Sequence, residues 1–484
     1  MGQLVTLPSS NAATAAEKSC ASKSCGSSAS QGDLPADVWE KVKDHPCYSE
    51  EAHQYFARMH VAVAPACNIQ CNYCNRKYDC SNESRPGVVS EKLTPEEAVR
   101  KVTAVANEVP ELSVLGIAGP GDACHDWKKS KATLDLVKAR IPDLKLCLST
   151  NGLALPECVD DIADLGVDHV TITINMVNPE IGARIYPWVY FKGKRYHGVE
   201  ASRLLHERQM QGLEMLVARN ILVKVNSVMI PGINDVHLLE VSKIVKAKGA
   251  FLHNVMPLIS DAKHGTHFGL TGQRGPTAKE LQGLQDRLGH GAKLMRHCRQ
   301  CRADAVGLLG EDRGQEFNLA ALPETVEYDP TLREAHREVI SRERSEHSET
   351  KAAVVADLKR LPEAPPVLIA VATRGGGRIN QHYGHAKEFQ VFEASPAGVK
   401  FIGHRKVETY CQGGWGEDAS LDASLQVLEG VTVVLCSKVG TCPREGLEAA
   451  GILVSDQYAY EWIEAGIAAW YAAYVGEATI GQTA

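Results

Sequence analysis

Short apolar segments alternate with longer stretches of helical periodicity between about residues 40 and 325. This alternation is typical of βαβ units, in which helices cover both faces of a parallel sheet. One helix start is well marked, because Thr94 and Glu97 form a capping box with Pro95 at the first helical position. The helix is expected to run through Ala98–Glu108. Six strands are predicted: Val61–Ala64, Leu112–Ala118, Leu144–Ser149, His169–Asn175, Leu222–Met229 and Phe251–Ile259.

The pattern changes on both sides of this region. Residues 1–36 are rich in Ser, Ala and Gly with little apolar periodicity, which predicts a disordered tail. Residues 326–365 are charge-dense and predicted to be helical, and they end in a stiff proline-rich break. A second, smaller α/β domain is expected over residues 366–476. Its predicted strands are Val367–Ala372, Glu388–Glu393, Val431–Leu435 and Ile452–Val454, and its predicted helices are Ser420–Leu428 and Pro443–Ala450.

Length, composition and charge predict a soluble protein with more than one core. A chain of 484 residues is expected to hold more than one core. Its 44% hydrophobic content is ordinary for a soluble protein, and no apolar run approaches the roughly 18 residues that span a membrane. The formal net charge of −7 argues against a nucleic-acid binder. The 15 cysteines and the lack of a secretory signal pattern predict a cytoplasmic protein whose cysteines bind metal.

The most informative motif is a C-x3-C-x2-C run formed by Cys67, Cys71 and Cys74, directly after the first predicted strand. Three thiolates from one short loop can hold three irons of a [4Fe–4S] cluster and leave the fourth iron open to a small molecule. Structural zinc is the alternative, but it usually takes a second pair of ligands at finger-like spacing, and none follows here.

This arrangement resembles the radical S-adenosylmethionine (SAM) superfamily, which also carries an aromatic residue where Tyr73 stands. The resemblance implies a partial, open (β/α)6 barrel and a cluster whose open iron binds SAM. An electron from the cluster then cleaves SAM to a 5′-deoxyadenosyl radical. It also implies SAM contacts from polar and glycine residues at strand ends, although some of these residues could equally serve as turn caps. The candidates are Gly119, Gly121, Asp122, Ser149, Asn151 and Asn175.

The barrel region holds more cysteines than one open cluster needs. Cys298 and Cys301 form a C-x2-C pair between arginines, which suits two corners of another cluster, with a zinc knuckle as the alternative. Two additional [4Fe–4S] clusters would want about eight ligands, and too few cysteines remain for that. Nitrogen or oxygen ligands are therefore expected as well.

Four segments, at residues 45–52, 59–80, 81–87 and 297–306, resemble the NifB family of nitrogenase cofactor maturases. The resemblance implies that two auxiliary [4Fe–4S] clusters are substrates. The enzyme fuses them and inserts a SAM-derived carbide and a sulfur, which gives NifB-co, the 8Fe precursor of the nitrogenase cofactor. One SAM donates a methyl group and a second supplies the radical that abstracts hydrogen from it. The ligands carried over are Cys47, His60, Cys80, Glu83, Cys147, Cys298 and Cys301.

Several of these residues have simpler interpretations. His60 could be a satisfied core histidine beside a strand, and Glu83 could be a helix-capping or loop carboxylate. Cys124 and Cys158 are interpreted as small buried hydrophobes. In the predicted disordered tail, Cys20 and Cys25 are expected to be solvent-exposed thiols, with metal binding by the pair as the alternative. The division of the auxiliary ligands between the two clusters stays open.

The second domain resembles the cofactor-binding NifX/NafY-type module, an RNase H-like α/β fold. His382 and His385 flank Gly384 in a predicted strand-connecting loop, where imidazoles could contact an anionic iron–sulfur cluster, although such histidines are often only solvated. Cys436 and Cys442 follow a predicted strand end and could join them or be structural.

The resemblance also implies partners: a NifX/NafY-type carrier, the NifEN scaffold, an iron–sulfur cluster donor and a ferredoxin-type reductant. Two other functions fit the cysteine pattern. One is a radical SAM peptide-modifying or sulfur-insertion enzyme with auxiliary clusters, which would share Cys67, Cys71 and Cys74 but would not require His60 or Glu83. The other is a non-catalytic iron–sulfur scaffold or carrier.

Overall fold

The structure is a computed structural model that describes residues 34–49, 51–80, 87–89, 91–289, 295, 301–309, 311–407 and 424–482. The predicted tail, residues 1–36, lies almost wholly outside these ranges. Its last residues are ordered, since Leu34 packs in a small hydrophobic cluster beside α1 (Ala36–Val42). No helix in the described ranges is both long and apolar enough to cross a bilayer.

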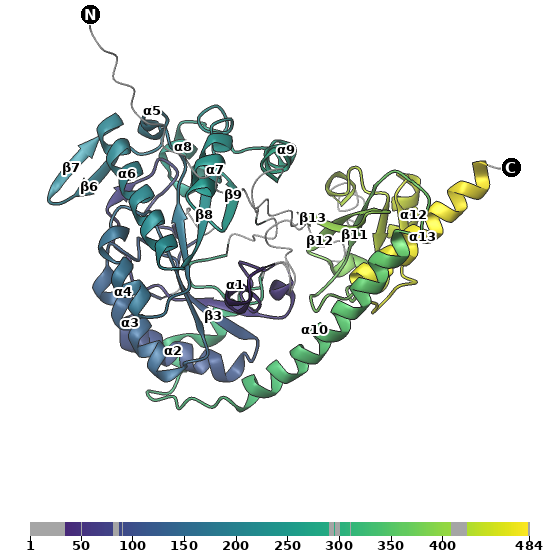
Figure 1. Cartoon of the computed structure of the whole chain (residues 1–484), viewed down its shortest axis with the longest axis horizontal. Helices are drawn as coiled ribbons and strands as arrows, with labels where there is room; N and C mark the ends of the chain where they lie inside the picture. Colours follow the sequence, from purple (N-terminus) through teal and green to yellow (C-terminus); the bar gives the residue numbers. More distant parts are fainter. Residues whose placement is uncertain are drawn as a thin grey trace, which may run out of the picture.

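A seven-stranded sheet forms the core of the larger domain, in the order β10-β1-β3-β4-β5-β8-β9. All neighbouring strands are parallel except β10, which pairs antiparallel with β1. Figure 1 shows the sheet curling while helices cover its outside. The predicted α/β half-barrel is therefore confirmed. The strands are β1 (Ala57–His60), β3 (Leu112–Ile117), β4 (Lys145–Thr150), β5 (His169–Thr173), β8 (Leu222–Met229), β9 (Leu252–Pro257) and β10 (Val306–Gly307).

Helices follow the strands as βαβ connections. The capping box at the start of α2 (Pro95–Glu108) is confirmed, because Glu97 N–H donates to Thr94 Oγ1 and Thr94 N–H donates to the Glu97 carboxylate. The other helices of the domain are α3 (Trp127–Arg140), α4 (Val159–Asp164), α5 (Pro179–Ala183), α6 (Gly198–Ala218), α7 (Leu238–Ala247), α8 (His267–Leu270) and α9 (Ala278–Gly289). Short 3-10 turns occur at Ala52–Gln54, Leu155–Glu157, Ala262–His264, Gly314–Phe317 and Leu319–Ala321.

The prediction of a first strand at Val61–Ala64 is wrong in its position. The strand is Ala57–His60, and the four apolar residues after it are buried but leave the sheet. Their backbone still finds partners, since Val61 N–H donates to the Gly116 carbonyl at 3.1 Å and the Ala62 carbonyl accepts from Leu93 N–H at 3.1 Å. An apolar run indicates that a segment is buried, and both a strand and the loop that follows it can be buried. It does not indicate which residues form the hydrogen bonds of the sheet.

The two faces of the sheet differ in character. Side chains of one parity, such as Met59, Leu115, Leu148, Val170 and Val223, belong to the large hydrophobic cluster shared with the helices. The other parity lines the concave face. There His60 pairs with Gly116, Gly116 with Cys147, and Cys147 with His169, so these residues form one row across four strands.

A small sheet sits beside the mouth of the half-barrel. It joins β2 (Ile69–Gln70), β6 (Trp188–Phe191) and β7 (Lys194–His197) in that order. A second hydrophobic cluster underlies it and contains Cys71 and Tyr73 as buried members, with Cys67 and Cys74 packed against it. The cysteine loop is therefore supported by a hydrophobic core of its own.

One long helix, α10 (Thr331–Leu358), leads from the barrel to the second domain (Figure 1). Near its start, the buried Arg333 forms an ion pair with Asp143 at 2.6 Å. Farther along the chain, α10 packs against α13 of the second domain. This helix was predicted from the charge-dense segment between the two regions.

The second domain contains a five-stranded sheet in the order β13-β12-β11-β14-β15. The predicted strands are present, but β13 and the C-terminal helix α13 were not foreseen. Of the predicted helix Ser420–Leu428, residues 424–427 are helical and residue 428 is in a turn, while residues 420–423 lie outside the described residues. The elements are β11 (Val367–Val371), a 3-10 turn at Tyr383–His385, β12 (Glu388–Ser395), β13 (Gly398–Lys406), β14 (Val433–Leu435), α12 (Thr441–Ala449), β15 (Leu453–Ser455) and α13 (Ile463–Gln482).

Candidate functional site

The cysteine loop begins where the chain leaves the carboxyl end of β1, and its backbone is held at several points. Gln70 Nε2 donates to the carbonyls of Cys71 at 3.0 Å and Cys74 at 2.8 Å. Arg76 donates to the Cys67 carbonyl at 3.2 Å and lies over the Trp188 ring. These bonds fix the loop on the small sheet, so the three sulfur atoms are presented from a rigid support.

The three thiols lie in a common, desolvated environment. Burial, together with the charges of the neighbouring Asp122 and Cys74, raises the pKa of Cys67 to about 12. Burial, together with the charges of Cys74 and Cys67, raises the pKa of Cys71 well above its usual value. Three mutually repelling buried thiolates need positive charge among them, and an iron–sulfur cluster supplies it. The residues present therefore fit such a cluster.

The predicted glycine segment after β3 packs directly on the cysteine loop. Gly121 has φ +91, and a Cβ atom there would collide with the Ala64 carbonyl, Pro65 and Ala66. The next amide, Asp122 N–H, donates to the Ala66 carbonyl at 2.8 Å. Glycine at position 121 is thus required both by its backbone angle and by the close approach of the two loops.

Asp122 fastens the glycine segment to the end of β4. Its buried carboxylate accepts from the backbone N–H groups of Cys124 (3.0 Å), His125 (2.9 Å) and Asn151 (2.6 Å) and from the Thr150 hydroxyl (3.1 Å). Burial raises the pKa of Asp122, and these hydrogen bonds offset part of the rise. Both oxygens are engaged within the protein, so the structure gives Asp122 a positioning role, and its predicted SAM contact stays a prediction.

Two asparagines from the predicted SAM site contact the cysteine loop. Asn151 Nδ2 lies 3.7 Å from Cys67 Sγ and donates to Asn68 Oδ1 at 2.8 Å. Asn175 is buried, and its Nδ2 donates to the Tyr73 hydroxyl at 2.6 Å and to the Tyr186 hydroxyl at 2.9 Å. The Tyr73 hydroxyl is also hydrogen-bonded to the Cys71 thiol. Asn175 therefore orients Tyr73 against a predicted cluster-binding cysteine, a role that the sequence did not reveal.

The concave face brings further predicted ligands beside this loop. Ser149, another candidate SAM contact, lies two residues beyond Cys147 along β4 on the same face. A Cβ atom on Gly116 would come within 3.2 Å of His60 Nε2, and one on Gly119 would come within 3.0 Å of Cys80 Cβ. The two glycines thus make room for His60 and Cys80 at the edge of the glycine segment.

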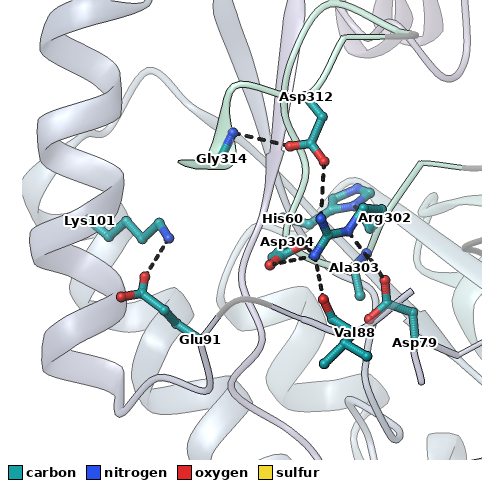
Figure 2. A network of polar contacts seen from close by, with 10 residues as sticks. All are labelled: His60, Asp79, Val88, Glu91, Lys101, Arg302, Ala303, Asp304, Asp312 and Gly314. Atoms are coloured by element: carbon teal, nitrogen blue, oxygen red, sulfur yellow. Dashed lines mark hydrogen bonds and ion pairs between the residues drawn. The ribbon is translucent and has the colours of Figure 1, made fainter. Parts of the chain in front are cut away.

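Arg302, which follows Cys301 in the chain, lies near Asp79, which precedes Cys80, so the two segments meet at this residue (Figure 2). Its guanidinium contacts Asp304 at 3.1 Å, Asp312 at 3.8 Å and, more distantly, Asp79 at 4.0 Å. The Asp79 carboxylate also accepts from Ala303 N–H at 3.2 Å. The sequence analysis did not predict this network, although Arg302 directly follows Cys301 in the chain.

Arg58 is a second residue beside the predicted ligands that the sequence did not single out. It is buried on the concave side of β1, and its Nε donates to Cys301 Sγ at 3.1 Å. Its remaining N–H groups donate to the carbonyls of Gly307, Leu308 and Glu311. The sequence did contain an indication, because Arg58 and His60 alternate with the apolar residues Ala57 and Met59 along this short strand.

Cys47 is placed by a group of buried rings. Its N–H donates to His45 Nδ1 at 3.2 Å, and the His45 ring lies 4.3 Å from the His169 ring and 4.6 Å from Tyr48. Burial lowers the pKa of both histidines well below the usual value, and nearby positive groups lower it further. Because His169 is the partner of Cys147 in the sheet, this ring cluster also borders that cysteine.

The other predicted residues fall into three groups. Glu83, Cys298, Cys20 and Cys25 lie outside the described residues. Cys124 and Cys158 are buried in the main core, which confirms their interpretation as small hydrophobes. In the second domain, Cys436 is a core residue whose burial raises its thiol pKa to about 12, whereas Cys442 is exposed.

His382 and His385 lie together on one 3-10 turn after β11. Their ring centroids are 4.8 Å apart, and His382 Nδ1 accepts from Gly384 N–H at 3.0 Å. His385 is exposed, while His382 is half-buried and its pKa is lowered by burial and by the neighbouring His385 and Lys438. The turn presents one imidazole outward from a fixed backbone.

Known proteins share both halves of this architecture. The radical SAM superfamily matches residues 61–245, and the family described as dinitrogenase iron-molybdenum cofactor matches residues 365–473. The FeMo cofactor biosynthesis protein NifB of Sinorhizobium fredii is 64% identical over 483 residues, covering 100% of this chain and 97% of that protein. The NifB proteins of Rhodobacter capsulatus (64% identical; 90% of this chain, 96% of that protein) and Azotobacter vinelandii (56% identical; 97% and 96%) are similar over nearly their whole lengths. The chain belongs to the NifB family of FeMo cofactor biosynthesis proteins and carries a radical SAM domain.

Proposed function

We propose that this radical SAM enzyme fuses two [4Fe–4S] clusters, with insertion of a SAM-derived carbide and a sulfur, into NifB-co, the 8Fe precursor of the nitrogenase cofactor. The observation that carries the proposal is the row of metal-ligating and small residues on the concave face, His60, Gly116 and Cys147, next to the cysteine loop. Two iron-binding regions in one half-barrel are what cluster fusion requires.

Cys67, Cys71 and Cys74 are the residues that would hold the resident cluster. When bound, that cluster supplies the electron for SAM cleavage. The chain's own residues prepare its environment: the Tyr73 hydroxyl hydrogen-bonds Cys71, and Asn151 Nδ2 faces Cys67. Gly119 and Gly121 bring main-chain N–H groups close to the loop, where they suit the carboxylate of an amino-acid ligand.

The substrate clusters would be held by Cys47, His60, Cys80, Cys147 and Cys301, together with Glu83 and Cys298 from outside the described residues. Mixed ligation suits a cluster that must leave as product, because imidazole and carboxylate bind iron less tightly than thiolate does. His60 Nδ1 lies 3.2 Å from the Arg302 carbonyl oxygen. A carbonyl can only accept, so Nδ1 carries the proton, and Nε2 is the metal-binding nitrogen of that tautomer.

The setting and partners are also proposals. We propose that the protein acts in the cytoplasm, where thiols stay reduced. It would receive clusters from an iron–sulfur donor and electrons from a ferredoxin-type reductant. Its product would pass to a NifX/NafY-type carrier and the NifEN scaffold. The similarity to NifB proteins supports these assignments, since those relatives are named for cofactor biosynthesis.

Anaerobic reconstitution with iron, sulfide, dithionite and SAM tests the proposal. We expect 5′-deoxyadenosine and a product that activates cofactor-free nitrogenase together with its assembly factors. Cys71→Ala should abolish SAM cleavage, whereas Cys301→Ala should spare part of it and lose the product. Cys158→Ala, which removes a core thiol, is the matched control and should behave like the wild type.

The outcomes separate the alternatives. Absence of 5′-deoxyadenosine from the wild-type reaction contradicts any radical SAM function and favours a passive iron–sulfur carrier. Formation of 5′-deoxyadenosine without a cofactor-competent product contradicts the maturase function and favours a peptide-modifying or sulfur-inserting enzyme. Equal loss of SAM cleavage in Cys71→Ala and Cys301→Ala contradicts the separation of the two regions.

A further inference from the structure

The hairpin formed by β6 and β7 projects from the barrel on the side away from the second domain (Figure 1). Residues 181–199, which contain it, include four Arg or Lys residues and no Asp or Glu, in a chain whose formal net charge is −7. Three of the four, Lys192, Lys194 and Arg195, lie on the turn and on β7, and all three are exposed. The hairpin is therefore a positively charged region on an acidic protein.

The two faces of the hairpin differ in their surroundings. Val189 and Tyr196, which are partners in the ladder, pack in the hydrophobic cluster that contains Cys71. Because side chains alternate along a strand, the residue pairs on either side of this one point to the opposite face. These outward pairs are Trp188 with His197 and Tyr190 with Arg195. One face thus supports the cysteine loop, and the other is turned toward solvent.

The outward face combines aromatic rings with guanidinium groups. The Arg195 Cζ atom lies 4.6 Å from the Trp188 ring centroid, and the Arg76 Cζ atom, from the cysteine loop, lies 5.1 Å from the same centroid. The Tyr190 side chain is 44% exposed. Tyrosine, tryptophan and arginine are the residues enriched in protein–protein interfaces. The outward face therefore has the composition of a docking surface.

The positive charges of this region are available to a partner. Among the described residues, no carboxylate forms an ion pair with Arg76, Lys192 or Arg195. The Lys194 ammonium lies 3.9 Å from the Glu200 carboxylate, but both side chains are largely exposed, and such pairs contribute little free energy. Carboxylates of another protein could therefore pair with these cations without first displacing a strong internal partner.

The hairpin is also bonded directly to the cysteine loop. β2 lies between the first two cysteines of the loop and pairs antiparallel with β6, which places Gln70 opposite Trp188. Gln70 Nε2 donates to the Cys71 carbonyl at 3.0 Å. Arg76, which covers the Trp188 ring, donates to the Cys67 carbonyl at 3.2 Å. A protein bound to the outward face would thus contact residues that are themselves bonded to the cysteine loop.

We propose that the outward face of the β6–β7 hairpin, together with Arg76, is the docking surface for an acidic one-electron carrier protein that reduces the resident cluster. The proposal rests on the proposed function, in which a ferredoxin-type reductant supplies electrons, and adds the place where that carrier binds. Electron transfer between proteins weakens steeply with distance, so the carrier must dock close to the cysteine loop. In the step, the carrier loses one electron and the resident cluster gains it, and no bond is formed or broken.

The charges on β7 have a simpler role to be tested against. Lysine and arginine on an edge strand hinder its pairing with the sheet of another copy. That role requires no aromatic face and no contact with the cysteine loop, and it predicts no change in electron delivery when the charges are reversed. Electron delivery from an acidic protein is therefore the property that distinguishes the two roles.

Charge reversal on the hairpin tests the docking surface in the full-length, reconstituted enzyme. The variant is Lys194→Glu/Arg195→Glu. The control, Lys243→Glu/Lys246→Glu, makes the same change in charge at two exposed lysines of α7, which Figure 1 shows well apart from β6 and β7. Each protein receives SAM and one of two reductants: dithionite, or a two-cluster ferredoxin of low isoelectric point that has been reduced and freed of its reductant beforehand. The rate of 5′-deoxyadenosine formation is measured at several ferredoxin and salt concentrations.

We expect kcat/KM for the ferredoxin to fall about tenfold or more in the hairpin variant, because it loses electrostatic attraction between the two proteins. Added salt should slow the wild-type reaction with ferredoxin and affect the variant much less, since salt screens exposed charges. The rate with dithionite should be unchanged. The α7 control should behave like the wild type with both reductants.

Each other outcome is decisive. Wild-type ferredoxin kinetics in the hairpin variant overturn the docking surface and leave the proposed function intact. So does an equal loss with ferredoxin and dithionite, which assigns the hairpin to support of the loop, or an equal loss in the α7 control, which assigns the effect to net charge. A wild type that dithionite drives but the acidic ferredoxin does not also overturns the docking surface. Absence of 5′-deoxyadenosine from the wild type with dithionite overturns the proposed function itself.

Discussion

His60 Nδ1 lies 3.2 Å from the carbonyl oxygen of Arg302, so the imidazole on β1 is oriented by the residue that follows Cys301 (Figure 2). The contact links two regions 242 residues apart in the chain. Arg302 is itself held by Asp304 and Asp312, with Asp79 nearby, so the carbonyl cannot easily turn away. A histidine and a cysteine, both predicted as ligands, are thereby fixed relative to each other.

This relationship predicts the effect of changes at position 60. His60→Ala should reduce NifB-co formation by about tenfold or more, because loss of ligands or of their orienting partners typically weakens metal sites by roughly 10–100-fold. SAM cleavage should continue, since the cysteine loop is untouched. The measurement is 5′-deoxyadenosine together with nitrogenase activation, and wild-type product formation by His60→Ala would show that the imidazole is only a core residue.

Gly121 predicts a sharp difference between two glycine substitutions. Gly121→Ala should destabilise the fold by more than about 2 kcal/mol and abolish SAM binding, because the new methyl group meets the Ala64–Ala66 backbone. Gly193→Ala is the matched control, since Gly193 also has positive φ, +80, but nothing lies within 4 Å of its Cβ position. It should cost only about 1 kcal/mol. Chemical denaturation and SAM binding distinguish the two, and equal effects would contradict the packing argument.

The hydrogen bond between Tyr73 and Cys71 is expected to affect the reduction potential of the resident cluster. Tyr73→Phe removes the hydrogen bond to Cys71, and hydrogen bonds to cluster sulfurs raise the reduction potential. The midpoint potential should therefore become more negative, and the loss of one of the two hydrogen bonds donated by the Asn175 amide nitrogen should cost about 1 kcal/mol of stability. Tyr186→Phe loses the other bond of Asn175 and serves as the control. An unchanged potential in Tyr73→Phe, measured by EPR-monitored redox titration, would contradict the assigned contact.

Glu464 makes the contact between α10 and α13 sensitive to acid. Burial alone would raise its pKa, but the charge of Lys351 and the hydrogen bond from His347 prevail and bring the pKa down to about 2. A carboxyl group whose pKa is lower when folded stabilises the protein above its ordinary pKa of 4.5, and this contribution is lost as pH falls from about 5 to about 2. The loss is about 3 kcal/mol.

The measurement is denaturant unfolding of the cluster-free protein at several pH values. The wild type should lose stability over this pH interval more steeply than Glu464→Gln, which cannot ionise. At pH 7, the substitution should be destabilising because it leaves Lys351 and His347 without their acidic partner. Parallel pH profiles for the two proteins would show that Glu464 titrates normally.

Much of the fold was predictable because its strands are apolar runs between helix-like segments and because α2 begins with a complete capping box. Errors arose where burial and hydrogen bonding diverge. Val61–Ala64 is as apolar as a strand but lies beyond the sheet, whereas β13 is a half-exposed edge strand whose residues carry little apolar signal. The Ala-rich α13 lacks a marked start and was missed for that reason.

The candidate site shows the same division. Cysteine spacing is local, so Cys67, Cys71 and Cys74 could be recognised from sequence alone. The buried cation Arg58 and the Asn175–Tyr73 contact depend on residues 243 and 102 positions apart, respectively, and no local pattern predicts such pairs. Asp122 was predicted to contact SAM because it ends a glycine segment, and that contact stays a prediction. No local pattern predicted that its oxygens also fasten two strand ends together.

The most direct test of the central claim is EPR spectroscopy of the reduced, anaerobically reconstituted protein with and without SAM. If three cysteines of one loop leave an iron open, SAM must bind that iron and change the signal of one [4Fe–4S] cluster. We expect this change in the wild type and in Cys301→Ala, and its absence in Cys71→Ala. A wild-type spectrum that stays the same when saturating SAM is added would contradict the account.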